Sequence, residues 1–299
     1  MADQADKLRA LRLIQKRSDQ SGEVPPSPGR PRMFTVAVTG GKGGVGKSVL
    51  VTNLAMACAR VGRRVLVVDA DLSLANVDLL LGMIPKANLS DVVFGSHRIE
   101  DVVIDTPYGF RFLPAASGLE EMATLDDFRR ERLIRELSRL EDTCDLMIID
   151  TATGVGRQTT HFVSIADRVL ILATPEPTAF SDAYATLKVL AMRPDPDRLG
   201  LVINRTDSVG QGTRTAKRIS AVAKRFLGFE PECFGVIPED EAVGQSVMRQ
   251  EPLLSMYPHS SASDAIVSLA AEVLREPEPH GPLSVDPDGV FKKVVNFES

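Results

Sequence analysis

Residues Gly40-Gly41-Lys42-Gly43-Gly44-Val45-Gly46-Lys47-Ser48 form a glycine-rich run that ends in a lysine and a serine. The run has the spacing GxxxxGK[ST], in which backbone N–H groups turn inward around a phosphate and the lysine reaches the outer phosphate oxygens. The sequence therefore predicts a nucleoside triphosphate site. We expect its loop contacts to come from Gly41, Lys42, Gly43, Gly44, Val45, Gly46, Lys47, Ser48 and Val49.

The segments on either side of this loop have the patterns that such a site requires. Residues 33–39 predict a buried strand, and residues 47–61 predict a helix that ends at Gly62. Unpaired N–H groups and the positive end of the helix dipole then favour an anion at the start of the helix. The order of strand, loop and helix indicates an α/β domain.

Lys42 is a second cation in a loop that already contains Lys47. Like charges this close repel unless a phosphate lies between them, so Lys42 is better explained by a partner that comes from elsewhere. On these residues the chain resembles the deviant Walker A family of ATPases, which includes MinD and ParA. The resemblance implies that ATP is the ligand and that Lys42 and Lys47 are catalytic. It also implies an ATP-bound homodimer in which Lys42 reaches the phosphates of the other subunit.

Acidic residues follow two further predicted strands. Residues 64–69 lead to Asp69 and Asp71, and residues 145–150 end in Asp150. Both runs are continuously apolar, as in parallel strands that are buried on both faces. Ligands of open parallel sheets lie beyond the carboxyl ends of the strands, so these acids are expected to point toward the nucleotide. The alternative for Asp69 or Asp71 is that it caps the following segment.

The resemblance assigns a role to each of these acids. Asp71 would orient or activate the attacking water. Mg²⁺ would be bound directly by the Ser48 hydroxyl and through water by Asp150, with Asp69 in its outer sphere. The segment Thr151-Ala152-Thr153-Gly154 would sense the γ-phosphate, although the family has a small residue where Thr153 stands.

Residues at the ends of two later strands resemble the adenine-binding part of the family. Asn204 and Arg205 end the run 199–205, and an amide suits adenine because it offers a donor and an acceptor side by side. Pro238 and Asp240 end the run 234–240, which resembles the segment that packs beside the base. These four residues complete the expected nucleotide contacts.

The chain as a whole is long enough for one large α/β core. It has 299 residues, a net charge of −5 and 43% hydrophobic residues. Strands near 33–39, 64–69, 110–114, 145–150, 168–173, 199–204 and 233–237 alternate with helices at 47–61, 126–141, 178–192, 211–227 and 259–275. We expect a doubly wound, mostly parallel sheet with helices on both faces, of the P-loop NTPase class, over residues 33–275.

The cysteines and histidines indicate neither a disulfide framework nor a structural metal. Cys58, Cys144 and Cys233 lie far apart and are expected to be small buried residues in a reducing cytoplasm. The four histidines lack the spacing of metal ligands. No apolar run approaches the roughly 20 residues of a membrane span, and the N-terminus lacks a signal sequence.

The N-terminal residues 1–17 form a short amphipathic segment, joined to the domain by a Ser-, Pro- and Gly-rich linker at 18–32. The segment is expected to fold on a partner, with a frayed tail as the alternative. It resembles the N-terminal element of the FlhG (FleN) branch of MinD-like ATPases, which control flagellar number and placement. The resemblance implies that this element stimulates a FlhF-type GTPase. The contact residues would be Asp3, Gln4, Ala5, Leu8 and Arg9.

Residues 276–299 are expected to form a tail whose end, 290–297, could be an amphipathic helix on an anionic membrane surface. The Val294-Val295 pair leaves a strand or a disordered end as alternatives. A cationic stripe is expected on the helix 211–227, as a partner surface or simply a solvated face. The net charge of −5 disfavours DNA as its partner.

Together these patterns predict a cytoplasmic, ATP-dependent switch that uses Mg²⁺ and dimerises with ATP. Its expected partners are a FlhF-type GTPase and flagellar regulatory or basal-body proteins. The alternatives are a ParA-type DNA or cargo partition ATPase, a MinD-type division-site ATPase, and a scaffold in which the nucleotide is purely structural.

Overall fold

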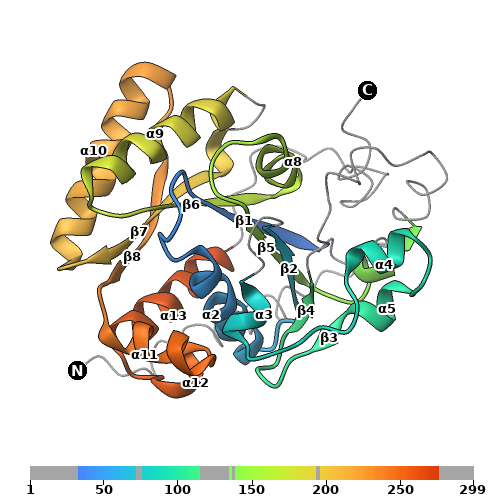
Figure 1. Cartoon of the computed structure of the whole chain (residues 1–299). Helices are drawn as coiled ribbons and strands as arrows, with labels where there is room; N and C mark the ends of the chain where they lie inside the picture. The colour runs from blue at the N-terminus through green and yellow to red at the C-terminus, as the bar shows by residue number, and fades with distance from the viewer. Residues whose placement is uncertain (1–32, 72–75, 115–134, 137–138, 193–195, 276–299) are drawn as a thin grey trace, which may run out of the picture.

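The computed structural model of the protein describes residues 33–71, 76–114, 135–136, 139–192 and 196–275 (Figure 1). They include an eight-stranded sheet in the order β3-β4-β2-β5-β1-β6-β7-β8. All neighbouring strands are parallel except the short β3, which pairs antiparallel with β4 at one edge. The strands are β1 (Phe34–Thr39), β2 (Val65–Ala70), β3 (Ile104–Asp105), β4 (Arg111–Leu113), β5 (Leu146–Thr151), β6 (Arg168–Ala173), β7 (Leu199–Thr206) and β8 (Glu232–Pro238). The expected fold class is confirmed.

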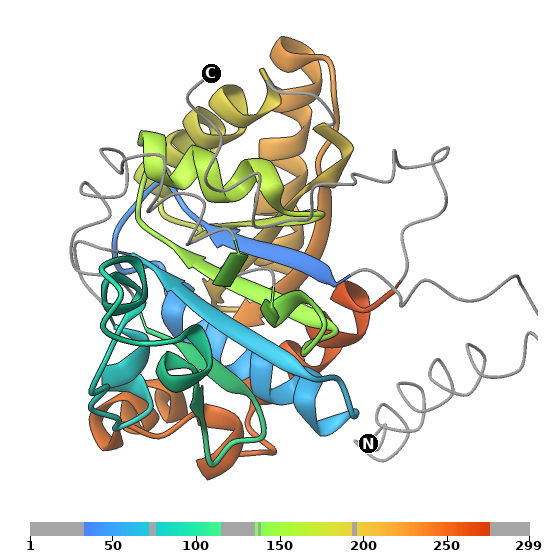
Figure 2. The same cartoon turned by 90° about the vertical axis from the view of Figure 1, so that its right-hand side faces the viewer.

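Helices cover both faces of the sheet, which forms the middle of three layers (Figures 1 and 2). One face carries α2 (Lys47–Arg60), α3 (Val77–Leu80), α11 (Glu241–Arg249), α12 (Leu253–Met256) and α13 (Ser261–Val273). The other carries α4 (Leu89–Val93), α5 (Ile99–Val102), α8 (Arg157–Ile165), α9 (Pro177–Ala191) and α10 (Val209–Leu227). A short 3-10 turn, η1 (Pro196–Arg198), precedes β7. No helix within the described ranges is both long and apolar enough to cross a membrane.

The alternation of side chains along the strands explains these layers. Val36 and Val38 of β1 pack in the core beneath α2, whereas Ala37 between them packs beneath α8 and α9. Every residue of β2, β5 and β6 is buried. Parallel strands that are covered on both faces are apolar throughout, which is why these strands could be recognised from continuous apolar runs.

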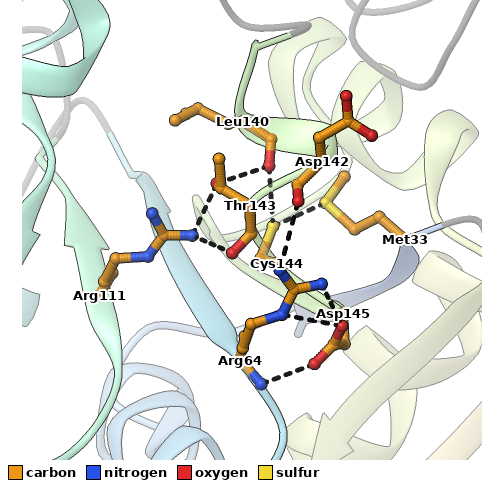
Figure 3. Close-up of polar contacts among 8 residues, drawn as sticks. All are labelled: Met33, Arg64, Arg111, Leu140, Asp142, Thr143, Cys144 and Asp145. Atoms are coloured by element: carbon orange, nitrogen blue, oxygen red, sulfur yellow. Dashed lines mark hydrogen bonds and ion pairs between the residues drawn. The ribbon is translucent and has the colours of Figure 1, made fainter. Parts of the chain in front are cut away.

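Two arginines, Arg64 and Arg111, join the amino-terminal ends of strands β2 and β4 to residues just before β5 (Figure 3). Arg64 forms an ion pair with Asp145 at 2.6 Å and also donates its backbone N–H to that carboxylate at 2.9 Å. Arg111 donates to the carbonyl and hydroxyl oxygens of Thr143, both at 2.7 Å. The hydrogen bond from Arg64 holds the pKa of Asp145 below its ordinary value. These contacts fix where the three strands begin.

The cysteine prediction is wrong for one residue. Cys58 and Cys144 are buried, but Cys233 is exposed. Cys233 lies near the start of β8, an edge strand with a neighbour on one side, and the first two residues of β8 are both exposed. Burial raises the pKa of the Cys58 thiol to about 12 and that of Cys144 to about 11.

Some expectations fall outside the described residues. These include the segments 1–17 and 18–32, with Asp3, Gln4, Ala5, Leu8 and Arg9, and the tail 276–299. Most of the expected helix 126–141 falls there as well, although residues 135–136 and 139–141 are helical.

Candidate nucleotide-binding site

The loop of residues 40–46 runs from the end of β1 to the first turn of α2. Gly46 precedes α2 with a φ of 96°, in the left-handed region, and no side chain caps the helix start. A Cβ at Gly46 would lie 2.6 Å from Nδ2 of Asn204, and a Cβ at Gly41 would lie 2.5 Å from the carbonyl oxygen of Asp182. These two glycines are needed because the chain passes too close to its neighbours for a side chain. The helix start keeps free N–H groups for an anion.

Lys47, in the first turn of α2, is buried and directed across the site. Its side-chain amine donates to the hydroxyl oxygen of Thr153 at 3.0 Å, and the residue is 7% exposed. Thr153 follows β5, so this contact joins the phosphate loop to the segment expected to sense the γ-phosphate. Gly154 strengthens that connection because its N–H donates to the carbonyl of Gly40 at 3.0 Å.

Lys42 lies on the outer side of the loop, and its side chain is 43% exposed. Its amine lies 2.6 Å from Oε2 of Glu176 and 3.4 Å from the hydroxyl of Thr178. Glu176 is the residue before α9, and the hydrogen bond from Lys42 lowers the pKa of its carboxyl. The charge of Arg205 acts in the same direction. The two lysines of the loop therefore occupy different environments, one buried and one exposed.

Three acids gather at the carboxyl ends of β2 and β5, as predicted. Asp69 and Asp150 stand opposite each other in the register of the two strands, and Asp71 follows on the same side of the site with only 8% exposure. Burial raises the pKa of Asp69 to about 8, and the neighbouring Asp150 adds to the rise. Burial also raises the pKa of Asp150 to about 7, although the Ser48 hydroxyl and the charge of Lys47 oppose the rise. A cation placed here would favour the ionised forms.

Buried carboxylate oxygens in this cluster lack hydrogen-bond donors. Both side-chain oxygens of Asp150 and Oδ2 of Asp69 lack a partner of good hydrogen-bond geometry among the described residues, although the Ser48 hydroxyl lies close enough to Asp150 to lower its pKa. Oδ1 of Asp69 accepts from the N–H of Asp71 at 3.0 Å. An unpartnered buried carboxylate is costly, so such atoms mark places where an ion or water is expected. The oxygens of Asp69, Asp150 and Ser48 therefore suit a hydrated magnesium ion, which prefers oxygen ligands and retains several waters.

The residues expected to contact adenine lie at the ends of β7 and β8. The side chains of two of them, Asn204 and Asp240, form hydrogen bonds with other parts of the protein. Asn204 donates from Nδ2 to the carbonyl of Val45 at 2.8 Å, which supports the phosphate loop from behind. Arg205 is exposed with a left-handed φ of 55°. Pro238 ends β8 beside Thr206. Asn204 therefore contacts the phosphate loop itself, which its resemblance to an adenine-binding residue did not predict.

Asp240 acts as a helix cap on two elements. Its Oδ1 accepts from the N–H of Ala242 in α11 at 3.0 Å, and Oδ2 accepts from the N–H of Ala262 in α13 at 3.0 Å and from the hydroxyl of Ser261 at 2.9 Å. Burial acts to raise the pKa of Asp240, but these hydrogen bonds outweigh it and the pKa lies below its ordinary value. The Asp240 carboxylate is therefore occupied by backbone and hydroxyl donors.

Glu176, Thr178 and the backbone of Asp182 are parts of the site that the sequence did not assign. All three lie just after β6, whose carboxyl end adjoins that of β1 in the sheet. The rule that ligands gather beyond these strand ends would have found this segment once the strand order was known.

The expected cationic stripe is present on α10, which begins two residues earlier than predicted. Lys224 pairs with Glu230 at 2.7 Å, and the guanidinium of Arg218 lies 5.7 Å from the centre of the Phe180 ring on α9. The stripe consists of Arg214, Lys217, Arg218, Lys224 and Arg225, all exposed.

Comparison with known proteins agrees with this geometry. A family model of the CobQ/CobB/MinD/ParA nucleotide-binding domain matches residues 36–253. The chain is 41% identical to the antiactivator FleN of Pseudomonas aeruginosa, over 83% of this chain and 88% of that protein. It is 30% identical to the flagellum site-determining protein YlxH of Helicobacter pylori, over 88% of this chain and 90% of that one.

A solved structure supports the same assignment. The MinC:MinD cell division protein complex of Aquifex aeolicus contains a chain that superposes with a TM-score of 0.67 and 26% identity, covering 82% of this chain and 98% of the other. The chain combines the glycine loop with two lysines, the acids at the ends of β2 and β5, and this strand order. The family model covers most of the described domain. On this evidence the protein belongs to the CobQ/CobB/MinD/ParA nucleotide-binding family.

Proposed function

We propose that the protein is an ATP-dependent switch whose ATP-bound form is a homodimer. The observation that carries the proposal is the difference between the two loop lysines. Lys47 is buried and directed across its own site, whereas Lys42 is half-exposed on the outer side of the loop. An exposed cation beside a phosphate loop is accessible to the phosphates of a second subunit. In the dimer, Lys42 of each chain would complete the phosphate site of the other.

The same site is suited to slow hydrolysis of ATP. Lys47 and the free N–H groups at the start of α2 would hold the phosphates, and the buried Asp71 would orient the attacking water. Mg²⁺, held through Ser48, Asp150 and Asp69, would neutralise charge on the phosphate oxygens. No three His, Cys, Asp or Glu side chains among the described residues converge closely enough to hold a metal ion by themselves. Phosphate oxygens and water would therefore complete its coordination.

We further propose that the switch regulates the number or placement of flagella. Support comes from the two relatives, whose names describe an antiactivator and a flagellum site-determining protein. The partners would be a FlhF-type GTPase, bound through residues 1–17, or a flagellar transcription activator or basal-body protein. The protein would act in the cytoplasm, with the segment 290–297 binding an anionic membrane surface.

A second candidate, a ParA-type partition ATPase, is favoured by one observation. Within the described part of the chain, α10 carries five exposed cations and no acid over its 19 residues. Cations on one helix face could neutralise DNA phosphates, with an affinity that falls steeply as salt rises. The net charge of −5 argues against this candidate.

Size-exclusion chromatography with light scattering tests the switch. The Asp71→Ala variant should suppress turnover, and we expect it to elute as a dimer with Mg–ATP and as a monomer with Mg–ADP. Adding Lys42→Ala to it should abolish the dimer while preserving ATP binding. An Asp71→Ala protein that binds ATP but stays monomeric would instead support a scaffold with a structural nucleotide.

Three further measurements test the biological roles. Deletion of residues 1–17 should remove stimulation of a FlhF-type GTPase and leave ATP affinity unchanged. Tight, salt-sensitive binding to random duplex DNA, lost when Arg214 and Arg218 are replaced by Ala, would favour the partition role. Flotation with anionic vesicles, with and without residues 290–299, tests the membrane contact, and equal flotation of the two proteins would exclude it.

A further inference from the structure

Thr153 provides an acceptor for the lysine of the phosphate loop. The residue is exposed in the segment between β5 and α8, yet its hydroxyl oxygen lies 3.0 Å from the buried amine of Lys47. A lysine amine has three donor directions. The Thr153 oxygen therefore uses one of the directions that a phosphate oxygen would use.

The backbone on both sides of Thr153 is held in place. The hydroxyl of Thr151 donates to the carbonyl of Val38 at 3.0 Å, and the hydroxyl of Thr159 donates to the carbonyl of Ala152 at 3.2 Å. The N–H of Gly154 donates to the carbonyl of Gly40 at 3.0 Å. A rotation of the exposed Thr153 side chain could therefore move its hydroxyl without disturbing β5 or the contact of Gly154 with the phosphate loop.

The distances place Thr153 within reach of a terminal phosphate. A phosphate oxygen would lie about 2.8 Å from the Lys47 nitrogen, so along a tetrahedral donor direction it would lie about 4.7 Å from the Thr153 oxygen. A side-chain rotation with a small backbone shift closes most of that gap. A hydroxyl can donate as well as accept a hydrogen bond. Once the Lys47 amine binds the phosphates, the Thr153 hydroxyl can therefore donate a hydrogen bond to a phosphate oxygen.

We propose that Thr153 is the residue through which this protein distinguishes ATP from ADP. Its hydroxyl exchanges the Lys47 amine for a γ-phosphate oxygen, to which it donates a hydrogen bond. The exchange moves the Thr153 hydroxyl away from Lys47 and toward the bound nucleotide. The inference rests on the ATP switch proposed above and names the side chain that reads the third phosphate.

The test compares Thr153→Val, which keeps the shape and removes the hydroxyl, with Thr153→Ser, which keeps the hydroxyl. Calorimetry on the full chain would measure the affinities for Mg–ADP and for a non-hydrolysable ATP analogue with Mg²⁺. Thr153→Val should bind the ATP analogue about tenfold or more weakly than the wild type, because hydrogen bonds to charged groups are strong. Its affinity for ADP should stay within about twofold. Thr153→Ser should retain the wild-type ratio of the two affinities.

Thr159→Val is the matched control, because it removes a hydroxyl that holds the same segment but does not contact Lys47. Its ratio of ATP-analogue to ADP affinity should equal that of the wild type. A folded Thr153→Val protein with the wild-type ratio, or with both affinities weakened equally, would overturn the inference and leave the switch intact. If Thr153→Val does not fold, the ratios of Thr153→Ala and Thr153→Ser decide in the same way. A wild-type protein that binds neither nucleotide overturns the proposed function and this inference together.

Discussion

The side-chain amine of Lys42 lies 2.6 Å from Oε2 of Glu176 in the same chain. Both side chains are about half-exposed, so the pair is screened by water and contributes little to the stability of the fold. In the proposed dimer Lys42 would have to leave Glu176 for the phosphates of the other subunit. Glu176 therefore competes with the dimer contact of Lys42.

Replacing Glu176 by Gln should favour the ATP-bound dimer. Without the carboxylate, Lys42 no longer has to break an ion pair before it reaches the partner's phosphates. The expected result is a dimer that forms at an ATP concentration about two- to tenfold lower than in the wild type. Sedimentation at several ATP concentrations measures this, on the Asp71→Ala background.

Glu230→Gln is the control for that experiment, because it breaks another exposed Lys–Glu pair of 2.7 Å far from the phosphate loop. It should leave the ATP requirement unchanged. If Glu176→Gln dimerises no more readily than Glu230→Gln, the proposed competition is absent.

Gly46→Ala should damage nucleotide binding, whereas Gly244→Ala, on α11, should not. Gly46 has a left-handed φ of 96°, and a Cβ there would lie 2.6 Å from Asn204, whereas no atom lies within 4 Å of a Cβ at Gly244. We expect Gly46→Ala to lower the free energy of unfolding by about 1 to 3 kcal/mol and the ATP affinity at least tenfold. Urea unfolding measures the free energy of unfolding, and titration with a fluorescent nucleotide measures the affinity. Equal losses in the two variants would contradict the role of backbone geometry.

The unfolding free energy of the nucleotide-free protein should fall as pH rises from about 4 to 8 through the contribution of Asp69 and Asp150. Burial raises both pKa values above those of the unfolded chain, so the stabilisation is present below the unfolded pKa of about 3.9 and is lost as pH passes the folded values. Asp150→Asn should remove the contribution of Asp150 to this pH dependence. The variant should be more stable than the wild type at pH 8 by about 1 to 3 kcal/mol. Urea unfolding at pH 5, 6, 7 and 8 checks this.

The same shifts predict that binding of Mg–nucleotide releases protons near pH 6 to 7, because a cation favours the ionised carboxyls. Calorimetry in two buffers with different ionisation enthalpies would detect the release. Identical heats in both buffers would argue against metal binding at these acids.

The ion pair of Arg64 with Asp145 gives a pH effect of the opposite sign. The folded pKa of Asp145 is lowered, so its stabilisation is present above pH 4 and is lost as pH falls through the folded pKa. Asp145→Asn should lower the free energy of unfolding by about 0.5 to 1 kcal/mol at pH 7, and the difference from the wild type should shrink below pH 4. Thermal unfolding of the variant and the wild type at pH 7 and at a pH below 4 measures this difference in stability. Asp197→Asn, at an exposed position in η1, should show no such dependence.

The main strands and the phosphate loop could be predicted because their signals are local. A strand such as β5 is apolar along its length, and the loop motif specifies its own backbone conformation. The helices α3, α4, α5 and α12 were not predicted, because four or five residues do not show a helical period, and the nine-residue helices α8 and α11 were not predicted either. The exposure of Cys233 depends on β8 being an edge strand, which no local pattern reveals.

The contacts of the site were less predictable than its residues. The acids were expected at the carboxyl ends of β2 and β5, and they lie there. The contacts of Lys42 with Glu176 and of Lys47 with Thr153 join residues more than 100 positions apart, so they depend on strand order and rotamers. Asp240 was expected beside the base, but its carboxylate is engaged by two helix starts, a detail that its position after β8 does not show.

That shared carboxylate has a mechanical consequence. Because the Asp240 carboxylate accepts from the first turns of both α11 and α13, the two helix starts cannot separate without breaking one of these hydrogen bonds. The starts of the two helices should therefore move together. A ligand that displaces the end of β8 would carry both of them with it.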